Sequence, residues 1–210
     1  MKRTLLILFI LHFAYLAQGQ LSSKQHQYPL ISQTGDSITL GQLIKGKIAF
    51  INFWFIPCGP CFAEMPMLQK IYNRYKSDTD FVFLSISKSS PESVRQFFTK
   101  TDSDTTLYRY FRNEVHLDTL TYPVFSVAKC QDIILGVVKN PMGAGYLLKL
   151  KGSPTDVAFN PPIFFSFKAF PTNILYSREG KILFKKTGFN KEAETNIEKE
   201  IISVIEKALK

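Results

Sequence analysis

The chain has 210 residues, 45% of them hydrophobic, and a formal net charge of +9 at pH 7. This length is sufficient for one domain with a sizeable core, and three cysteines are too few to staple a small secreted scaffold. The basic residues form no compact tract with interleaved aromatics, so we expect no nucleic-acid partner. We interpret the charge as solvated surface, with acidic partners or anionic membrane faces as the alternative.

Residues 1–19 have the composition of a secretory signal peptide. A basic start at Lys2 and Arg3 precedes the apolar stretch Leu5–Ala17, and Gly19 completes a small-residue cleavage site. The apolar stretch is shorter than the ~20 residues of a membrane span. We therefore predict export to the periplasm or cell envelope. An uncleaved N-terminal anchor, which would keep the protein close to the membrane, is the alternative.

We expect no regular structure in the first residues after the signal peptide. Residues 20–35 are polar with scattered apolar positions and are interpreted as a lead-in segment. A turn at 34–37 and a short strand at Ile38–Leu40 predict an N-terminal hairpin. We place the folded domain at residues 36–210.

Two cysteines lie where a predicted strand is followed by a helix. Lys47–Phe55 is an almost continuous apolar run, which is typical of a buried strand in a mostly parallel sheet. Gly59 and Pro60 break the chain, and helical spacing follows. Cys58 is thus expected near the free N–H groups of a helix N-terminus, which stabilise a thiolate. Cys61 is one turn further on, close enough to form a small disulfide ring, so we predict a dithiol–disulfide redox site.

Further strands and helices follow in an alternating order. Residues 80–87 predict a second buried strand, and Ser90-Pro91-Glu92 has the composition of a helix start. Strand, helix, strand and helix in this order indicate a parallel α/β layer. Residues 122–127 are expected to supply another strand. Near the end, Ala193–Leu209 has the apolar spacing of an amphipathic helix that covers the sheet.

The chain between the predicted strand at 122–127 and Pro171 is longer than one connection requires. We predict an insertion at about residues 128–168, with several Gly/Pro-rich loops and the apolar run Ile163–Phe167. One hypothesis is that its aromatic residues form part of a surface on which a partner docks. The alternative is additional packing over the edge of the sheet.

The segment around the cysteines resembles a known family. Trp54, Cys58-Gly59-Pro60-Cys61 and Pro66 together resemble the active-site helix of the thioredoxin fold. With Asn52 and Glu64, the string resembles the TlpA/ResA-like thioredoxins, which are secreted or membrane-associated. That family usually has tryptophan before the first cysteine, whereas this chain has Pro57, which leaves redox potential and partner choice open.

The resemblance implies the thioredoxin fold: an α/β domain with a central mixed sheet flanked by helices, preceded here by an N-terminal hairpin. It also implies that Phe170-Pro171-Thr172 is the cis-proline loop that lies against the redox pair, followed by the strand at 173–177 and a hairpin into 182–184. An ordinary trans proline at the start of a strand is the alternative.

The predicted chemistry is thiol–disulfide exchange with other proteins. Cys58 attacks a partner disulfide, and Cys61 then attacks the Cys58 sulfur and releases the reduced partner. Glu64, three residues after Cys61, shares its helix face and is predicted to accept the proton of Cys61, with its pKa raised by burial. A solvated glutamate without this role is the alternative.

The expected partners are protein thiols and disulfides together with an upstream electron donor, and no cofactor or metal is expected. We assign partner contacts to the rim of the site, formed by Trp54, Pro57, Pro60, Phe170 and Pro171. The Gly-Pro pair between the cysteines resembles reducing thioredoxins, which favours the reducing direction, although the compartment and partners decide it.

Other functions remain open at this stage. A peroxiredoxin-type peroxidase would have Thr-x-x-Cys, whereas this chain has Phe55-Ile56-Pro57-Cys58. A copper-binding assembly factor would need a late histidine, and none follows His116. Zinc requires four ligands, but the candidates beyond the cysteine pair are scattered. A non-catalytic scaffold is disfavoured by the intact pair. Cys130 is interpreted as a buried inert thiol, with a regulatory or intermolecular disulfide as the alternative.

Overall fold

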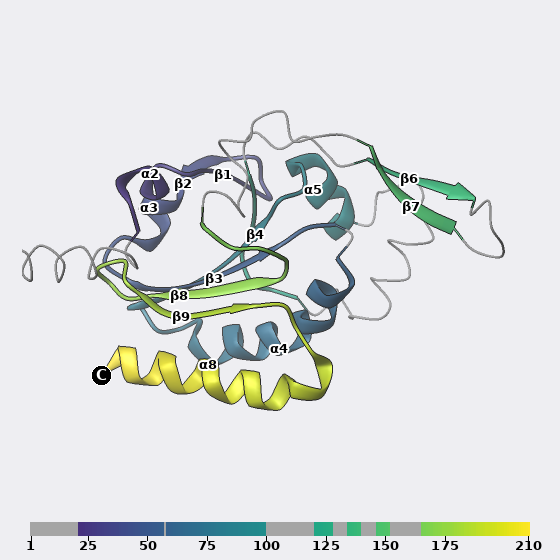
Figure 1. Cartoon of the computed structure of the whole chain (residues 1–210). Helices are drawn as coiled ribbons and strands as arrows, with labels where there is room; N and C mark the ends of the chain where they lie inside the picture. The colour runs from purple at the N-terminus through teal and green to yellow at the C-terminus, as the bar shows by residue number, and fades with distance from the viewer. Residues whose placement is uncertain (1–20, 57, 100–119, 128–133, 140–145, 152–164) are drawn as a thin grey trace, which may run out of the picture.

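The computed structural model describes residues 21–56, 58–99, 120–127, 134–139, 146–151 and 165–210 (Figure 1). The helices are α2 (Ser23–His26), α3 (Leu40–Ile44), α4 (Gly59–Tyr75), α5 (Pro91–Thr99), the 3-10 turn η3 (Lys191–Ala193) and α8 (Glu194–Leu209). The strands are β1 (Pro29–Ser32), β2 (Ser37–Thr39), β3 (Ile48–Trp54), β4 (Phe81–Ser87), β5 (Val124–Val127), β6 (Ile134–Lys139), β7 (Tyr146–Lys151), β8 (Thr172–Tyr176) and β9 (Ile182–Thr187).

Seven strands form one mixed sheet in the order β2-β1-β5-β4-β3-β8-β9. β3 and β4 pair in parallel, as do β4 and β5, and the remaining neighbours are antiparallel. Helices α4 and α8 lie on one face, while α2 and α3 lie on the other (Figure 1). This architecture confirms the predicted α/β thioredoxin fold. It places β3, which leads to the cysteine pair, in the interior of the sheet.

Each face of the sheet has its own apolar core. All seven residues of β3 are buried, and their side chains alternate between the two cores, as the pleat of a strand requires. Phe50 and Trp54 pack with α4 and α8, and Ile51 and Phe53 pack with α3. The continuous apolar pattern of this strand thus follows from burial on both faces.

The N-terminal region is more ordered than its composition predicts. The hairpin formed by β1 and β2 is confirmed, with Gly35 at φ +94° in its turn. However, β1 lies within residues 20–35, which we interpreted as a lead-in, and it pairs with both β2 and β5. Tyr28 and Leu30 are fully buried in the second core. The folded unit therefore begins before Asp36, because a few well-placed apolar residues suffice to fix an internal strand.

The predicted insertion is described only in part. β6 and β7 pair with each other as an antiparallel two-stranded sheet. Cys130 and the rest of residues 128–133, 140–145 and 152–164 lie outside the described residues. At the end of the insertion, Phe165 and Phe167 are buried, and both rings pack against Phe53. These two residues therefore pack on the sheet, as the alternative interpretation of this segment expected.

The predicted signal peptide, residues 1–19, also lies outside the described residues, which begin at Leu21. Within the described ranges, none of the helices combines the length and the apolar character needed to cross a membrane.

Candidate redox site

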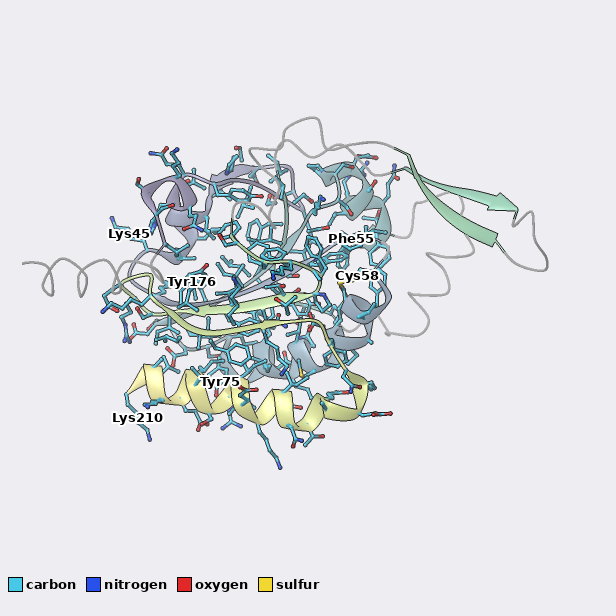
Figure 2. The ribbon with its side chains drawn as sticks, in the orientation of Figure 1. Lys45, Phe55, Cys58, Tyr75, Tyr176 and Lys210 are labelled. Carbon is cyan, nitrogen blue, oxygen red and sulfur yellow. A yellow bond between two sulfur atoms is a disulfide. The ribbon has the colours of Figure 1, made fainter. Side chains whose placement is uncertain are left out.

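Cys58 and Cys61 form a disulfide at the start of α4, with their Cα atoms 5.2 Å apart (Figure 2). Cys58 is the N-cap residue of the helix, and Pro60 lies in its first turn, where a missing backbone N–H costs nothing. The backbone N–H of Phe62 donates to the Cys58 carbonyl and completes the first helical hydrogen bond at 3.1 Å. Cys58 is 6% exposed and Cys61 is fully buried, so Cys58 is the sulfur nearer to solvent.

Hydrogen bonds from the end of β4 hold the segment that leads to Cys58. The N–H of Ile56 donates to Oγ of Ser89 at 2.8 Å, and the N–H of Ser89 donates to Oγ of Ser87 at 3.1 Å. The N–H of Lys88 donates to the carbonyl of Trp54 at 2.8 Å. The connection after β4 therefore fixes the connection after β3. Sequence reasoning missed Ser89, because the role of its hydroxyl depends on a residue 33 positions away.

The proline strand reaches the same end of the sheet. The peptide bond between Phe170 and Pro171 is cis, which confirms that prediction. Phe53 pairs with Thr172 in the antiparallel register of β3 and β8, so the residues just before β8 lie beside those just after β3. The rings of Phe55 and Phe170 accordingly meet edge to face, with centroids 5.1 Å apart. Figure 2 labels Phe55 and Cys58 at this end of the molecule.

Glu64 lies buried in a network of amide hydrogen bonds. Its Oε1 accepts from Nδ2 of Asn52 at 2.7 Å, and its Oε2 accepts from Nδ2 of Asn173 at 2.9 Å. Nδ2 of Asn52 also donates to Oδ1 of Asn173 at 2.9 Å, and Oγ of Ser85 donates to Oδ1 of Asn52 at 3.1 Å. Both carboxyl oxygens and both amides of the asparagines thus have partners.

Burial dominates the electrostatics of this carboxyl. Desolvation raises the pKa of Glu64 from 4.5 to about 8, although the hydrogen bonds from Asn173 and Asn52 oppose the rise. The structure therefore differs from the solvated glutamate that we held as an alternative: Glu64 is 1% exposed. A group with this pKa can gain or lose a proton near neutral pH, as a proton acceptor in catalysis must.

A second ionisable group lies near Glu64. Burial raises the pKa of Tyr122, and the charge of Glu64 raises it further. The Tyr122 hydroxyl has no hydrogen-bond partner among the described residues. Its ring packs against those of Tyr72 and Phe83 in the core beside α4. Tyr122 therefore stays neutral and provides an apolar wall that contributes to the desolvation of the site.

The predicted rim residues differ in their exposure, and Pro171, which was predicted to contact partners, is buried. Pro60 is exposed on the first turn of α4, and Phe170 is partly exposed. Trp54, in contrast, is fully buried among the rings of Phe62, Phe97 and Phe98, so it supports the site from beneath and does not line its rim. Its side chain follows the inward-facing alternation of β3. Pro57 lies outside the described residues.

The described residues contain no group of three or more histidine, cysteine, aspartate or glutamate side chains arranged to hold a metal ion. At the start of α4, the described residues bring together two sulfurs and one buried carboxyl. Asn173 belongs to this site although sequence reasoning did not select it. The available signal was an asparagine in a mostly apolar strand, which matches Asn52 in β3.

Comparison with known proteins agrees with the fold and the motif. A family model described as Redoxin matches residues 19–125. The thiol–disulfide oxidoreductase ResA of Halalkalibacterium halodurans is 39% identical over 64 residues, which cover 30% of this chain and 35% of that protein. The ResA protein of Bacillus anthracis is 36% identical over 64 residues, 36% of its length. The chain thus matches only about a third of the length of these relatives, and the predicted resemblance to ResA is confirmed.

Solved structures share the fold at lower identity. A protein from Chlorobium tepidum, assigned as a thiol:disulfide interchange protein DsbE, superimposes with a TM-score of 0.52 at 19% identity and covers 90% of this chain and 98% of its own. A protein from Bacteroides thetaiotaomicron, assigned as a protein disulfide isomerase, gives a TM-score of 0.50 at 19% identity, with 90% and 93% coverage. At this identity, these matches establish the thioredoxin fold of the chain.

Proposed function

This chain belongs to the Redoxin family, and from that premise we propose that it is a thiol–disulfide oxidoreductase that reduces disulfides in other proteins. The observation that carries the proposal is the disulfide between Cys58 and Cys61 at the N-terminus of α4, with the cis-proline segment at the same end of the sheet. A disulfide in this position can open to a thiolate that the free N–H groups of the helix stabilise.

The reaction begins from the reduced dithiol. The thiolate of Cys58 attacks one sulfur of a partner disulfide; the partner S–S bond breaks, a mixed disulfide forms, and the first partner thiolate leaves. Cys61 then loses its proton, and its thiolate attacks the Cys58 sulfur. The bond between Cys58 and Cys61 forms, and the second partner thiolate leaves. The partner gains two electrons, the pair loses two, and an upstream dithiol must reduce the pair again.

Glu64 is the proposed acceptor of the Cys61 proton. The two residues lie three positions apart on α4 and are both buried, so no bulk water is available to take this proton. With a pKa raised to about 8, the carboxyl has a proton affinity close to that of a thiol. The proton can then return to the departing partner thiolate or to solvent when the site opens.

Partner contacts are proposed at the half-buried surface around the pair. Phe55 and Phe170 present adjoining rings, and Pro60 is exposed beside Cys61. We propose that an extended partner chain forms hydrogen bonds with the backbone of Phe170. We further propose that the reaction takes place in the periplasm or cell envelope, following the predicted signal at residues 1–19. The reducing direction is part of the proposal.

The direct test is a trapping experiment in native cell envelopes. The Cys61→Ser variant should retain covalent adducts on Cys58, because the second attack is lost, and mass spectrometry should identify disulfide-containing proteins in them. The Cys58→Ser variant should trap none, and Cys130→Ser in the trapping background should leave the adducts unchanged. Equal adduct formation by Cys58→Ser and Cys61→Ser would contradict the proposal.

A further inference from the structure

A row of polar side chains crosses three adjacent buried strands beneath Glu64. In the sheet register, Asn52 of β3 stands opposite Ser85 of β4 on one side and Asn173 of β8 on the other. All three residues are buried, although each strand otherwise consists mainly of apolar residues. Burying polar groups is costly unless they are fully hydrogen-bonded, and this row ends on a single carboxyl.

The hydrogen bonds fix which end of each amide faces the carboxyl. Oδ1 of Asn52 accepts from Ser85, and Oδ1 of Asn173 accepts from Asn52, so both amide oxygens are occupied. Both amide nitrogens therefore donate to Glu64, one to each oxygen. An amide turned by 180° would place its oxygen against a carboxylate oxygen, and two acceptors that face each other in a buried site are unfavourable.

From this arrangement we infer that Asn52 and Asn173 are positioning residues that orient Glu64 and favour its ionised, proton-accepting form, with Ser85 orienting the Asn52 amide. This inference deepens the proposed function and rests on it for its catalytic meaning. Two donors directed at a carboxylate favour the charged form over the neutral acid. Without them, full burial would keep Glu64 protonated to a still higher pH, so that a smaller fraction of the protein could accept the proton of Cys61 at a given pH.

The other ionisable groups near Glu64 do not stabilise its carboxylate in place of the two asparagine amides. Tyr122, just before β5, is kept neutral by burial and offers no positive charge. The next position of the row is Lys186 of β9, whose Nζ lies 4.0 Å from a carboxylate oxygen of Glu200 on α8. On α4 itself, Cys61 is held in the disulfide. Asn52 and Asn173 are thus the two groups in this set that donate directly to the carboxyl.

The test measures the pKa of Glu64 itself and does not depend on activity. In the oxidised protein, the carboxyl carbons of ¹³C-labelled glutamates are titrated by NMR, and Glu64→Gln identifies the signal. Asn173→Leu and Asn52→Leu should each raise the pKa of Glu64 by about one to two units, the effect of one hydrogen bond to a charged group. The two variants alter different strands, so either one that folds provides the test.

Gln69→Leu is the matched control. Gln69 is a buried amide on the same helix whose hydrogen bonds go to Asn73 and Thr121, away from Glu64. Its removal should lower the melting temperature and leave the pKa of Glu64 within a few tenths of a unit. An unchanged pKa in a folded Asn173→Leu or Asn52→Leu protein would overturn the inference. A second outcome is that the pKa of Glu64 rises in these variants while the pH profile of thiol exchange does not change. That outcome would support the inference about the two amides and would contradict the proposed proton transfer from Cys61 to Glu64.

Discussion

Asn173 of β8 donates a hydrogen bond to Glu64 of α4 at 2.9 Å, across 109 residues of sequence. The bond joins the strand that follows the cis-proline to the helix that begins at the redox pair. The carboxyl is therefore positioned by both halves of the site at once. A displacement of β8 would alter the environment of Glu64 as well as the surface on which a partner binds.

The pH dependence of stability should change when Glu64 is replaced by glutamine. The pKa of Glu64 is about 8 in the folded protein against an ordinary value of 4.5, so the folded state binds this proton more tightly. This contribution to stability is complete below pH 4.5 and is lost as the pH rises towards 8. The free energy of unfolding of Glu64→Gln relative to the wild type should therefore increase over this range, by up to about 1.4 kcal/mol per pH unit.

Denaturant unfolding of the oxidised proteins at pH 5, 6, 7 and 8 provides the measurement. Gln69→Leu, which removes a buried amide and no ionisable group, is the control and should run parallel to the wild type. A Glu64→Gln curve parallel to the wild type as well would show that Glu64 ionises normally in the folded protein.

Ser89→Ala should destabilise the segment that leads to Cys58. The substitution leaves the buried N–H of Ile56 without its acceptor, a loss that costs about 1–3 kcal/mol. Thermal or denaturant unfolding measures this cost directly. Thr34→Ala, which removes a hydroxyl in the exposed turn between β1 and β2, should change stability by less than about 0.5 kcal/mol. Equal stabilities of the two variants would mean that Ser89 does not fix this connection.

Phe170→Ala should slow the reduction of protein disulfides more than that of small disulfides. Its ring packs edge to face against Phe55 at 5.1 Å and against Phe167 at 5.2 Å, on the surface proposed to contact partners. Loss of an aromatic contact of about 0.5–1.5 kcal/mol corresponds to a roughly 2- to 10-fold decrease in kcat/KM. A small aromatic disulfide reaches Cys58 without this surface and should react within about twofold of the wild-type rate.

The comparison requires steady-state rates with both substrates. Leu183→Ala, which removes an exposed apolar side chain on the edge strand β9, is the control and should leave both rates unchanged. Equal losses for the large and the small substrate would indicate that Phe170 acts on the redox pair itself.

Local sequence patterns predicted much of this fold and the centre of its site. The apolar run ending at Phe55, the Gly-Pro break and the helical spacing after it placed Cys58 and Cys61 correctly at a strand-to-helix junction. The cis bond at Pro171 was implied by the resemblance of Phe170-Pro171-Thr172 to the cis-proline loop of thioredoxins, and proline is the residue that can adopt that isomer at low cost. These features depend on neighbours within a few residues, which a sequence displays directly.

Features that depend on register were not predictable in the same way. The contact of Asn173 with Glu64 requires knowing that β8 pairs with β3 and which residues stand opposite. The same limit applies to Ser89, and to β1, whose short apolar pattern became a strand only because β5 and β2 pair with it. Trp54 was assigned to the rim by its place in the motif, whereas the alternation of β3 directs it into the core.

The most direct test of the central claim follows the two sulfurs during one turnover. The fully reduced protein is mixed with a disulfide-containing protein substrate, and the reaction is stopped by alkylation and analysed by peptide mass spectrometry. Reactive thiol should disappear from Cys58 and Cys61 together, one new disulfide for each substrate disulfide opened, while Cys130 keeps its state. Reduced Cys58 and Cys61 that persist beside an unreduced substrate would contradict the assignment of this pair as the redox centre.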